Sequence, residues 1–432
     1  TWTLQNVQGY KYETNAPGYR HSLPHMYVFI KDFQAEGKKI DVLDDTQRLY
    51  SYYRNFVGNI NRVEDPELKK LSVALTAGAA SESEKVKRIF YWVKDNIKYI
   101  AFENGYEGFI PRESALVYER KFGDCKDMAA LICSMAGYAG IDKVKLCWIG
   151  TREIPYTYSE LATPAVDNHM IAVYDDNNTY TFLDATDRET RYGIPTAFIQ
   201  GKEALIGLGD QYKIVTVPTV LPDENTGRQK IELKLDGEKL SGSGSLGYSG
   251  FGRSHILMQI GDAKSKTRFE MIKSLLLKGS NKFNLLDFKE TNLSNRDQPY
   301  QVDYTFDLDN YAVKVDKDTY LALVMDKPFE KMQLEADRTS PVEFDYLTAD
   351  DITYDLLLPK GTTVKSLPKN FRLDNDLMQA SLDYSATAEK ISLRMIIKLR
   401  KLMLFPQDFK RWNQTVACLR ENYSETLILT EK

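Results

Sequence analysis

The sequence has 432 residues, 43% hydrophobic and 12% aromatic, so it can bury substantial cores, and its length favours about two to four domains. The 57 Lys and Arg residues nearly balance 61 Asp and Glu residues, and the net charge of -4 argues against nucleic acid as a partner. No apolar run reaches the roughly 20 residues of a membrane-spanning helix, so we expect no transmembrane segment.

Helical patterns follow an irregular N-terminal segment. The first 60 residues show little periodicity, and we interpret them as a linker or the edge of a larger protein. From Ser81, a capping pair with Glu84 precedes apolar residues at helical spacing, which predicts an amphipathic helix. A second helical pattern starts within "GDCKDMAALICSMAGYAG" and ends at Gly140, so Cys125 is predicted to lie in its first turn.

Three strands are predicted after this helix, from "VKLCWIG", "NHMIAVYDD" and "TYTFLDATD". The last two strands flank the polar turn "DDNN". If residues 175–178 form a four-residue loop, His169 lies directly opposite Asp184, with both side chains on one face of the sheet. A two-residue turn at Asn177 and Asn178 would change this pairing, and a slip of one residue would put the two side chains on opposite faces.

From about Ile214 the pattern changes to short strands separated by turn-forming residues, which predicts one or two mostly-β domains. We assign residues 213–345 to a β-rich domain with one helix near 264–277, and residues 346–432 to a C-terminal β-rich segment. The sequence "GSGSLG" at 242–247 matches the Gly-x-Gly-x-x-Gly pattern of dinucleotide-binding loops. Because its alternating Ser and Gly continue a β-like segment, we interpret it as a strand with a closely approached backbone.

The four cysteines and four histidines are too few and too widely spaced to predict a zinc site, and we expect no metal and no cofactor. Cys133, Cys147 and Cys418 fit packing roles, and a disulfide between the first two stays open. Cys125 differs from them, because a thiolate at a helix N-terminus is stabilised by unpaired backbone N–H groups and by the helix dipole.

Catalysis by such a thiolate needs a partner that returns a proton to the leaving group. His169 is the candidate base, because a carboxylate at Asp184 would hold its imidazole and stabilise the imidazolium. The chain order Cys125, His169, Asp184 therefore predicts a catalytic triad.

The motifs "GDCKD" before an apolar helix, "NHMIAVY" and "LDATD" together resemble the catalytic core of the transglutaminase-like superfamily, which includes papain-like peptidases. Upstream, "IKYIAFENGYEGFIPRESALVYERKFGDCKD" is similar to a bacterial branch in which β-domains flank this core. The resemblance implies an α+β fold, with a papain-like core at 61–212 followed by mostly-β, sandwich-like domains. It also implies that residues 1–60 are a linker or the remnant of a missing N-terminal β-domain.

By that resemblance, Cys125 is the nucleophile, His169 the base and Asp184 the acid that orients the base. The family usually has Asp-Pro-Thr where this chain has "DAT" at 184–186. This departure affects the rigidity of the strand end more than the chemistry.

A second departure is Asp167, which precedes the Asn-His pair where the family often has an aromatic residue. A carboxylate near the base would raise the pKa of that base or alter substrate choice. For the oxyanion, the backbone N–H of Cys125 is the expected donor, and Tyr99 and Asn104 are candidates for a side-chain donor.

These features predict a cysteine-dependent amide-bond enzyme, a peptidase or amidase or an acyl transferase, that acts on a protein or peptide through an acyl-enzyme. Peptidase or amidase activity outranks cross-linking, since bacterial members of the resembling branch need not cross-link proteins. The resemblance also implies a periplasmic or cell-surface location, because the resembling proteins are often exported.

Two alternatives stay open. The chain could be a non-catalytic or weakly catalytic binding or assembly protein of the cell envelope that uses its β-domains, which make up more than half of the sequence. An arylamine acyltransferase shares the Cys, His, Asp order, but it would have a basic, Gly-rich approach to the cysteine where this chain has "ERKFGDC".

Overall fold

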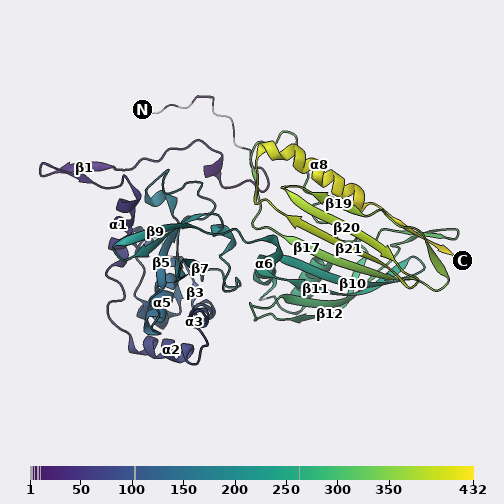
Figure 1. Cartoon of the computed structure of the whole chain (residues 1–432), viewed down its shortest axis with the longest axis horizontal. Coiled ribbons are helices and arrows are strands. Elements are labelled where there is room, and N and C mark those ends of the chain that lie inside the picture. The colour runs from purple at the N-terminus through teal and green to yellow at the C-terminus, as the bar shows by residue number, and fades with distance from the viewer. Residues whose placement is uncertain (1–2, 4, 7–8, 10, 102–103, 262) are drawn as a thin grey trace.

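The chain forms two domains that lie side by side, an N-terminal α+β domain and a C-terminal β-rich domain (Figure 1). The structure, a computed structural model, describes residues 3, 5–6, 9, 11–101, 104–261 and 263–432. An α+β core followed by a mostly-β region confirms the predicted fold class. None of the helices within these ranges is both long and apolar enough to cross a membrane.

The α+β domain is built on a five-stranded antiparallel sheet of order β7-β6-β5-β8-β9, with helices packed against it. The strands are β5 (Val144–Ile149), β6 (His169–Asp176), β7 (Thr179–Leu183), β8 (Glu203–Leu208) and β9 (Gln211–Thr216). The helices are α1 (Thr46–Val57), α2 (Pro66–Thr76), α3 (Glu82–Asn96), α4 (Ser114–Arg120) and α5 (Cys125–Tyr138). A short parallel pair, β3 (Lys98–Tyr99) and β4 (Phe122–Gly123), precedes α5.

Caps and apolar spacing account for α3 and α5, the two helices predicted here. The Ser81 hydroxyl accepts a hydrogen bond from the Glu84 N–H at 3.1 Å and so caps α3. After α5, Gly140 has a φ of +77°, in the left-handed region that glycine adopts readily. Apolar side chains of both helices, among them Ile89 and Leu131, are fully buried in one core. The two helices and the three strands β5, β6 and β7 are confirmed.

The N-terminal 60 residues are only partly linker-like. β1 (Asp32–Ala35) and β2 (Lys38–Asp41) form a hairpin that projects from the domain (Figure 1). The following helix α1 buries Leu49, Tyr50 and Tyr53 in the core of the α+β domain. The predicted boundary at residue 60 is therefore wrong for α1. Its buried positions include two tyrosines, a residue type that is also common in strands, so the segment had no clear helical signal.

The β6–β7 hairpin differs from the predicted register. A two-residue turn, with φ values of 54° and 71° at Asn177 and Asn178, replaces the four-residue loop. The predicted direct opposition of His169 and Asp184 is therefore wrong. The observed register displaces Asp184 by two positions, and an even displacement keeps both side chains on one face of the sheet.

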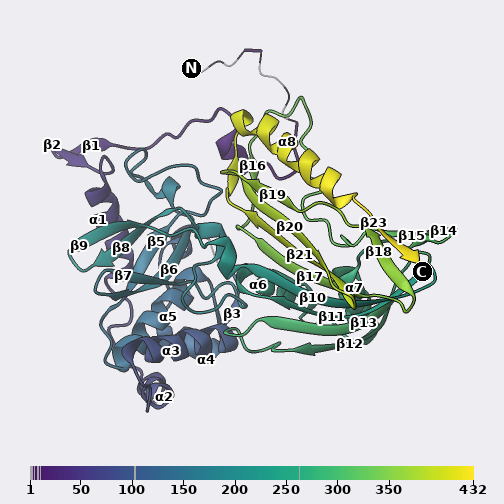
Figure 2. The ribbon, with the colours of Figure 1, turned by 45° about the vertical axis from the view of Figure 1, so that its right-hand side comes forward.

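The β-rich domain is organised around one eight-stranded sheet of order β12-β13-β11-β10-β17-β21-β20-β19 (Figure 2). Its strands are β10 (Thr226–Asp236), β11 (Lys239–Tyr248), β12 (Phe283–Thr291), β13 (Tyr300–Leu308), β17 (Ala349–Leu357), β19 (Phe371–Asp374), β20 (Met378–Ala386) and β21 (Lys390–Leu399). A four-stranded sheet contains β14 (Val313–Val315), β15 (Asp318–Leu321), β23 (Leu427–Glu431) and β18 (Thr362–Ser366), and β16 (Val342–Glu343) pairs with β22 (Met403–Leu404). The helices are α6 (Gly250–Ile260), α7 (Ser265–Leu276) and α8 (Pro406–Tyr423).

The predicted units 213–345 and 346–432 form one domain. Strand β10 pairs in parallel with β17, and residues of both units share one apolar core. The division into two units is therefore wrong, and the alternative of one β-rich domain holds. Helix α7 confirms the helix predicted near 264–277, whereas α6 and α8 were not predicted. Helix α8 did carry a signal, because Trp412, Val416, Leu419 and Tyr423 recur at helical spacing and are fully buried.

The glycine-rich segment 242–247 lies within β11, which confirms that it is a strand. A Cβ atom on Gly242 would lie 2.7 Å from the Phe306 ring, and one on Gly244 would lie 2.6 Å from the Tyr304 ring. Glycine is needed at both positions because aromatic side chains of β13 occupy the space next to the strand.

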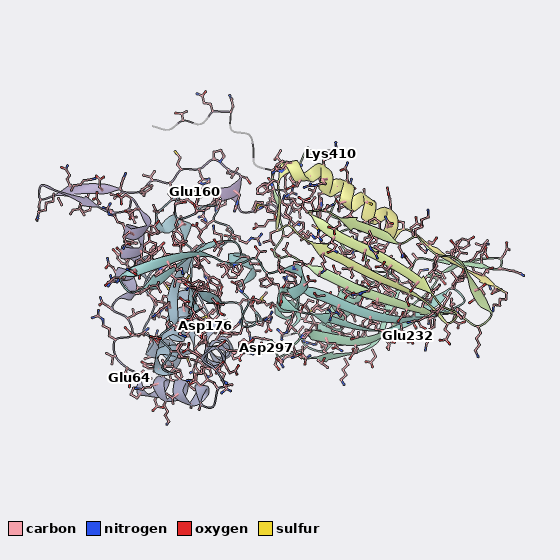
Figure 3. All side chains as sticks on the ribbon, in the orientation of Figure 1. Glu64, Glu160, Asp176, Glu232, Asp297 and Lys410 are labelled. Atoms are coloured by element: carbon pink, nitrogen blue, oxygen red, sulfur yellow. The ribbon has the colours of Figure 1, made fainter. Side chains whose placement is uncertain are left out.

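Ion pairs and a small apolar cluster join the two domains. Asp297, labelled between them in Figure 3, accepts a hydrogen bond from the Tyr91 hydroxyl at 2.7 Å and pairs with Lys87 at 2.6 Å, both on α3. On α6, Arg253 pairs with Glu189 at 3.1 Å. The apolar cluster consists of Ile194, Val220 and Phe251.

Candidate active site

Cys125 is the first residue of α5 and is partly exposed. The Asp124 carboxylate caps the helix by accepting from the N–H groups of Lys126 and Asp127, and the Asp127 carboxylate accepts from the Asp124 N–H at 3.0 Å. The preceding strand β4 approaches the helix closely at Gly123, where a Cβ atom would lie only 2.6 Å from the Asp127 Cβ. This reciprocal cap fixes the first turn, and with it the direction of the Cys125 side chain.

The charged groups around this helix tip are paired. Lys126 Nζ donates to the Asp124 carboxylate at 2.5 Å, and both side chains are buried. Arg112 donates to Asp127 from its backbone N–H at 2.8 Å and from its guanidinium at 2.6 Å. Within the described part of the chain, the N–H of Cys125 has no hydrogen-bond partner. This N–H and the helix dipole therefore favour negative charge next to the thiol.

His169 and Asp184 form a buried pair. The His169 Nε2–H donates to Asp184 Oδ2 at 2.9 Å, and the two side chains are 7% and 1% exposed. Asp184 Oδ2 also accepts from the Thr196 hydroxyl at 2.7 Å, and Oδ1 accepts from the hydroxyl and the N–H of Thr186 at 2.7 and 3.1 Å. Because Nε2 is used by the carboxylate, Nδ1 is the ring nitrogen left for the thiol.

Burial disfavours the ionised forms of both members, but their mutual attraction outweighs it. The pKa of His169 is raised to about 10 despite burial, because Asp184 and then the Cys125 side chain stabilise the imidazolium. The pKa of Asp184 is lowered despite burial, because His169 and the hydroxyls of Thr196 and Thr186 stabilise the carboxylate. An imidazolium at neutral pH is the form that stabilises a nearby thiolate.

Cys125 and His169 line one cavity of about 360 Å³, and Asp184 lies behind the imidazole. The structure thus brings together the three residues of the predicted triad. Much of the remaining wall is aromatic or apolar, with Tyr53, Phe109, Trp148, Pro164 and Met170.

Three aromatic residues of the site were not predicted from the sequence. The Tyr53 ring of α1 stacks on Trp148, with centroids 5.3 Å apart and planes 5° apart. The Phe198 ring meets His169 edge-on, with centroids 5.4 Å apart. Each comes from a different segment of the chain, and no local pattern marks them as site residues.

Asp167 also lines the cavity, but its hydrogen bonds are to tyrosines. It accepts from the hydroxyls of Tyr53 and Tyr158, each at 2.7 Å. Burial raises the pKa of Asp167 to about 7, although both hydroxyls stabilise the carboxylate. The sequence predicts that Asp167 raises the pKa of His169 or alters substrate choice. The raised pKa of His169 comes from Asp184 and Cys125, so the first of these expectations has no support here.

Tyr99 and Asn104 are not among the described residues that line the cavity. Tyr99 is in β3, where its backbone pairs with Gly123, and its side chain is 42% exposed. Asn104 is exposed and precedes Gly105, which does line the cavity. Their role as oxyanion donors stays a prediction.

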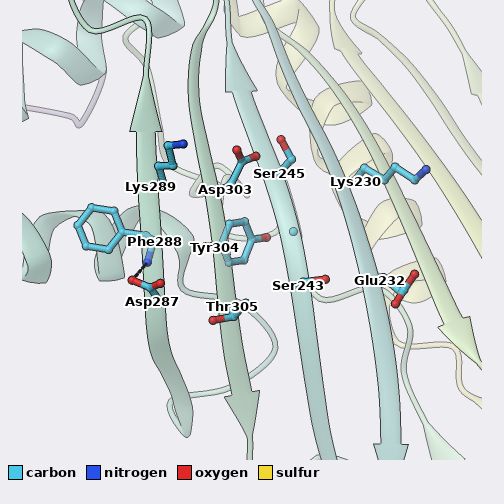
Figure 4. A pocket seen from close by; sticks show the side chains of 11 residues that line it. Lys230, Glu232, Ser243, Ser245, Asp287, Phe288, Lys289, Asp303, Tyr304 and Thr305 are labelled. Carbon is cyan, nitrogen blue, oxygen red and sulfur yellow. Dashed lines mark hydrogen bonds between the residues drawn. The ribbon is translucent and has the colours of Figure 1, made fainter.

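A second hollow, of about 470 Å³, lies on a face of the eight-stranded sheet (Figure 4). The small side chains of Ser243 and Ser245 on β11 form its floor. Charged side chains from the neighbouring strands border it, namely Lys230, Glu232, Asp287, Lys289 and Asp303. Its described lining residues include neither cysteine nor histidine, so this hollow lacks a nucleophile paired with a base.

Known families match two parts of the chain. Residues 69–185 match the family described as the transglutaminase-like superfamily. Residues 317–429 match a domain of unknown function with a solved structure, DUF3858. None of the curated proteins matches this chain.

Among solved structures, the crystal structure of a "putative protease" from Parabacteroides distasonis resembles the chain, with a TM-score of 0.58 and 11% sequence identity. The likeness covers 99% of this chain and 65% of that one, so this chain spans about 65% of the length of its neighbour. At this identity the likeness concerns the fold alone. Together with the matching family, it shows that the chain carries a transglutaminase-like domain followed by a mostly-β region.

Proposed function

We propose that this protein cleaves or transfers amide bonds, with Cys125 as nucleophile, His169 as base and Asp184 as the group that orients the base. The observation that carries the proposal is the cavity in which a helix-tip thiol faces an imidazole held from behind by a buried carboxylate. A transglutaminase-like domain supports it, because that superfamily is the one that the cysteine and histidine motifs resemble.

In the first half of the reaction, the Cys125 thiolate attacks the substrate carbonyl carbon and forms a C–S bond. The carbonyl oxygen becomes an oxyanion, which the Cys125 N–H stabilises. As the C–N bond breaks, the His169 imidazolium gives its Nδ1 proton to the leaving amine, and a thioester remains on Cys125. Asp184 holds the ring through Nε2 throughout.

In the second half, a water molecule or an acceptor amine attacks the thioester carbonyl and gives a proton to the neutral imidazole. The C–S bond breaks and Cys125 returns as a thiolate beside the imidazolium. We favour hydrolysis over transfer, so the protein would act as a peptidase or amidase on a protein or peptide. The fold neighbour described as a "putative protease" supports this choice.

The alternative, a binding protein that uses its β-rich domain, has less support. It would be favoured by a cysteine buried beneath that domain. Every described residue that lines the cysteine cavity comes from the α+β domain, however, and Cys125 is partly exposed. We also propose a periplasmic or cell-surface location, which rests on the sequence resemblance alone and is tested by cell fractionation.

The pH dependence of Cys125 alkylation by iodoacetamide, followed by peptide mapping, tests the proposed function. We expect labelling at about pH 7 to be faster than that of an ordinary thiol, because the His169 imidazolium lies beside the cysteine and stabilises negative charge there. His169→Ala should slow the labelling. Labelling no faster than that of an ordinary thiol, with no effect of His169→Ala, would contradict the proposal.

A further inference from the structure

Asp167 is a charged group of the cavity that the proposed mechanism does not use. The residue is extended, with φ of −121° and ψ of 139°, and it precedes His169 by two positions. In an extended chain, residues two apart point to the same side and lie about 7 Å apart. Both line the cavity that contains the thiol. A group bound at Asp167 would therefore lie within about two peptide residues of the reacting carbonyl.

The Asp167 carboxylate is oriented but not neutralised. The hydroxyls of Tyr53 and Tyr158 donate to its two oxygens, and burial, with Asp167 next, raises the pKa of both tyrosines well above 10, so they stay protonated donors. Among the described residues, no cation lies within ion-pair distance of Asp167. Lys202 acts on it only from farther away, since the Lys202 ammonium donates to the carbonyls of Ile154 and Tyr156 at 2.5 and 3.1 Å.

The other charged groups of the cavity already have partners. The Lys126 ammonium is 2.5 Å from the Asp124 carboxylate, and the His169 imidazolium is paired with Asp184. The cavity wall next to Asp167 includes the stacked pair of Tyr53 and Trp148, which are 2% and 6% exposed and so keep water from this side of the carboxylate. An unpaired carboxylate in a largely apolar wall binds an ammonium or guanidinium group strongly.

We infer that Asp167 selects substrates that carry a positive charge within about two residues of the scissile amide on its acyl side. The cation would be either a free amino terminus or a basic side chain, and it would form an ion pair with the Asp167 carboxylate. This inference rests on the proposed function, because it assumes that the acyl part of the substrate occupies the cavity. It gives Asp167 a role in substrate binding that is separate from the role of the triad.

Four peptidyl acyloxymethyl ketones test the inference. These probes alkylate an active-site thiol by forming a C–S bond and releasing a carboxylate. An alanyl-alanyl probe with a free amino terminus is compared with its N-acetyl form, and an acetyl-lysyl-alanyl probe with its acetyl-norleucyl-alanyl form. We expect the cationic member of at least one pair to react about tenfold faster or more, since charge pairing in a cavity is strong. The first pair reports a free amine and the second a basic side chain.

Asp167→Asn should reduce this preference to less than about twofold, and the ratio of rates within each pair is the measured quantity because it does not depend on how far the variant slows both probes of that pair. Asp176→Asn is the matched control, because it removes the same charge from the exposed end of β6 and should keep the preference. Asp167→Glu, which keeps the charge, should retain part of it. Equal rates within both pairs in the wild type, or a preference that survives in Asp167→Asn, would overturn the inference.

The wild-type protein gives a second test that does not depend on how Asp167→Asn folds. Both probes of a pair react with Cys125, so the ionisation of this thiol changes both rates equally and leaves their ratio unchanged. For the lysyl and norleucyl pair, in which the lysine stays cationic over this range, we expect the ratio to fall between about pH 8 and pH 5.5, because a carboxyl group with a pKa of about 7 becomes protonated there and loses its attraction for a cation. Three other titratable groups interact with Asp167, namely Tyr53, Tyr158 and Cys147. Their pKa values are raised well above their usual range, so all three stay neutral in this pH interval and do not contribute to the fall in the ratio. A ratio that is constant over this interval would contradict the inference.

If Cys125 reacts with none of the probes, the proposed function fails, and binding then decides the inference separately. Cys125→Ala protein would be titrated with alanyl-alaninamide and N-acetyl-lysinamide, and with their neutral counterparts, and followed by NMR. Binding of a cationic amide that is lost in Cys125→Ala/Asp167→Asn would uphold recognition of a cation. No difference between cationic and neutral amides would overturn it.

Discussion

Each domain contains a carboxylate whose pKa burial raises to about 7, Asp167 in the α+β domain and Asp350 in the β-rich domain. Asp167 shares its cavity with Cys125 and His169. Asp350 lies in a cavity of about 290 Å³ with Asp326, whose negative charge raises the pKa of Asp350 further. The shifts have the same direction and a similar size, but the chemical surroundings differ.

The comparison shows that a perturbed carboxylate does not by itself identify an active site. Burial raises the pKa of any carboxyl group that loses water, whatever lies beside it. In the β-rich domain the lining of the Asp350 cavity includes neither cysteine nor histidine among the described residues, and Asp326 is 3.7 Å from the buried ammonium of Lys278. Of these two cavities, as far as the described residues show, the one in the α+β domain has a cysteine, a histidine and a second carboxylate that holds the histidine.

The largest effect is expected for Cys125→Ala, which removes the proposed nucleophile. Turnover of a substrate found by screening peptide amides should fall by about 10⁴-fold or more, as happens when an enzyme loses its nucleophile. Cys133→Ala, on the same helix and half-buried, should leave turnover within about twofold. Unchanged turnover in Cys125→Ala would place the chemistry elsewhere and remove the difference between the two domains.

Asp184→Asn should lower turnover by about 10³-fold, because the amide does not hold the imidazole in its protonated, oriented form.

Asp184→Asn should also change how the stability of the protein depends on pH. A raised pKa of His169 stabilises the fold fully below about pH 6.5, and a lowered pKa of Asp184 does so above about pH 4. The stability advantage of the wild type, measured by thermal unfolding, should therefore be largest between these values and shrink as the pH rises towards 10. An advantage that grows with rising pH would contradict this assignment.

Asp350→Asn should affect stability and leave the candidate active site unchanged. Because burial raises the pKa of Asp350, its ionisation destabilises the folded protein as the pH rises above about 4. The variant should therefore gain several degrees in Tm relative to wild type at about pH 8, and less at about pH 5. Its Cys125 alkylation profile should match that of wild type. A changed profile would show that the two domains are coupled.

The smallest effect is expected for Phe198→Ala, which uncovers the edge of the His169 ring. Water would then weaken the attraction between His169 and Asp184, so Cys125 alkylation at about pH 6 should slow by about threefold. Leu208→Ala is the matched control, because Leu208 in the same domain is also 38% exposed. A full loss of labelling in Phe198→Ala would mean that the ring does more than shield the pair.

Local patterns in the sequence determined the helix that carries Cys125, its cap and the three central strands. A capping residue acts on backbone groups two or three positions away, and apolar spacing reflects a single helix or strand, so both can be read from one segment. The motifs around Cys125, His169 and Asp184 also predicted which residues meet, although the register proposed for the hairpin is wrong. His169 and Asp184 still meet, because the observed register differs from the predicted one by two positions and keeps both side chains on one face of the sheet.

Only the tertiary structure decided what surrounds those residues. Tyr53 of α1 and Tyr158, which come from segments far apart in the sequence, meet at Asp167, and the parallel pairing of β10 with β17 unites two predicted units into one sheet. Such contacts depend on how whole elements pack against one another, and no pattern within either segment encodes its distant partner. The sequence therefore determined which three residues form the candidate site, and long-range packing determined the cavity, its unpaired carboxylate and the single β-rich domain beside it.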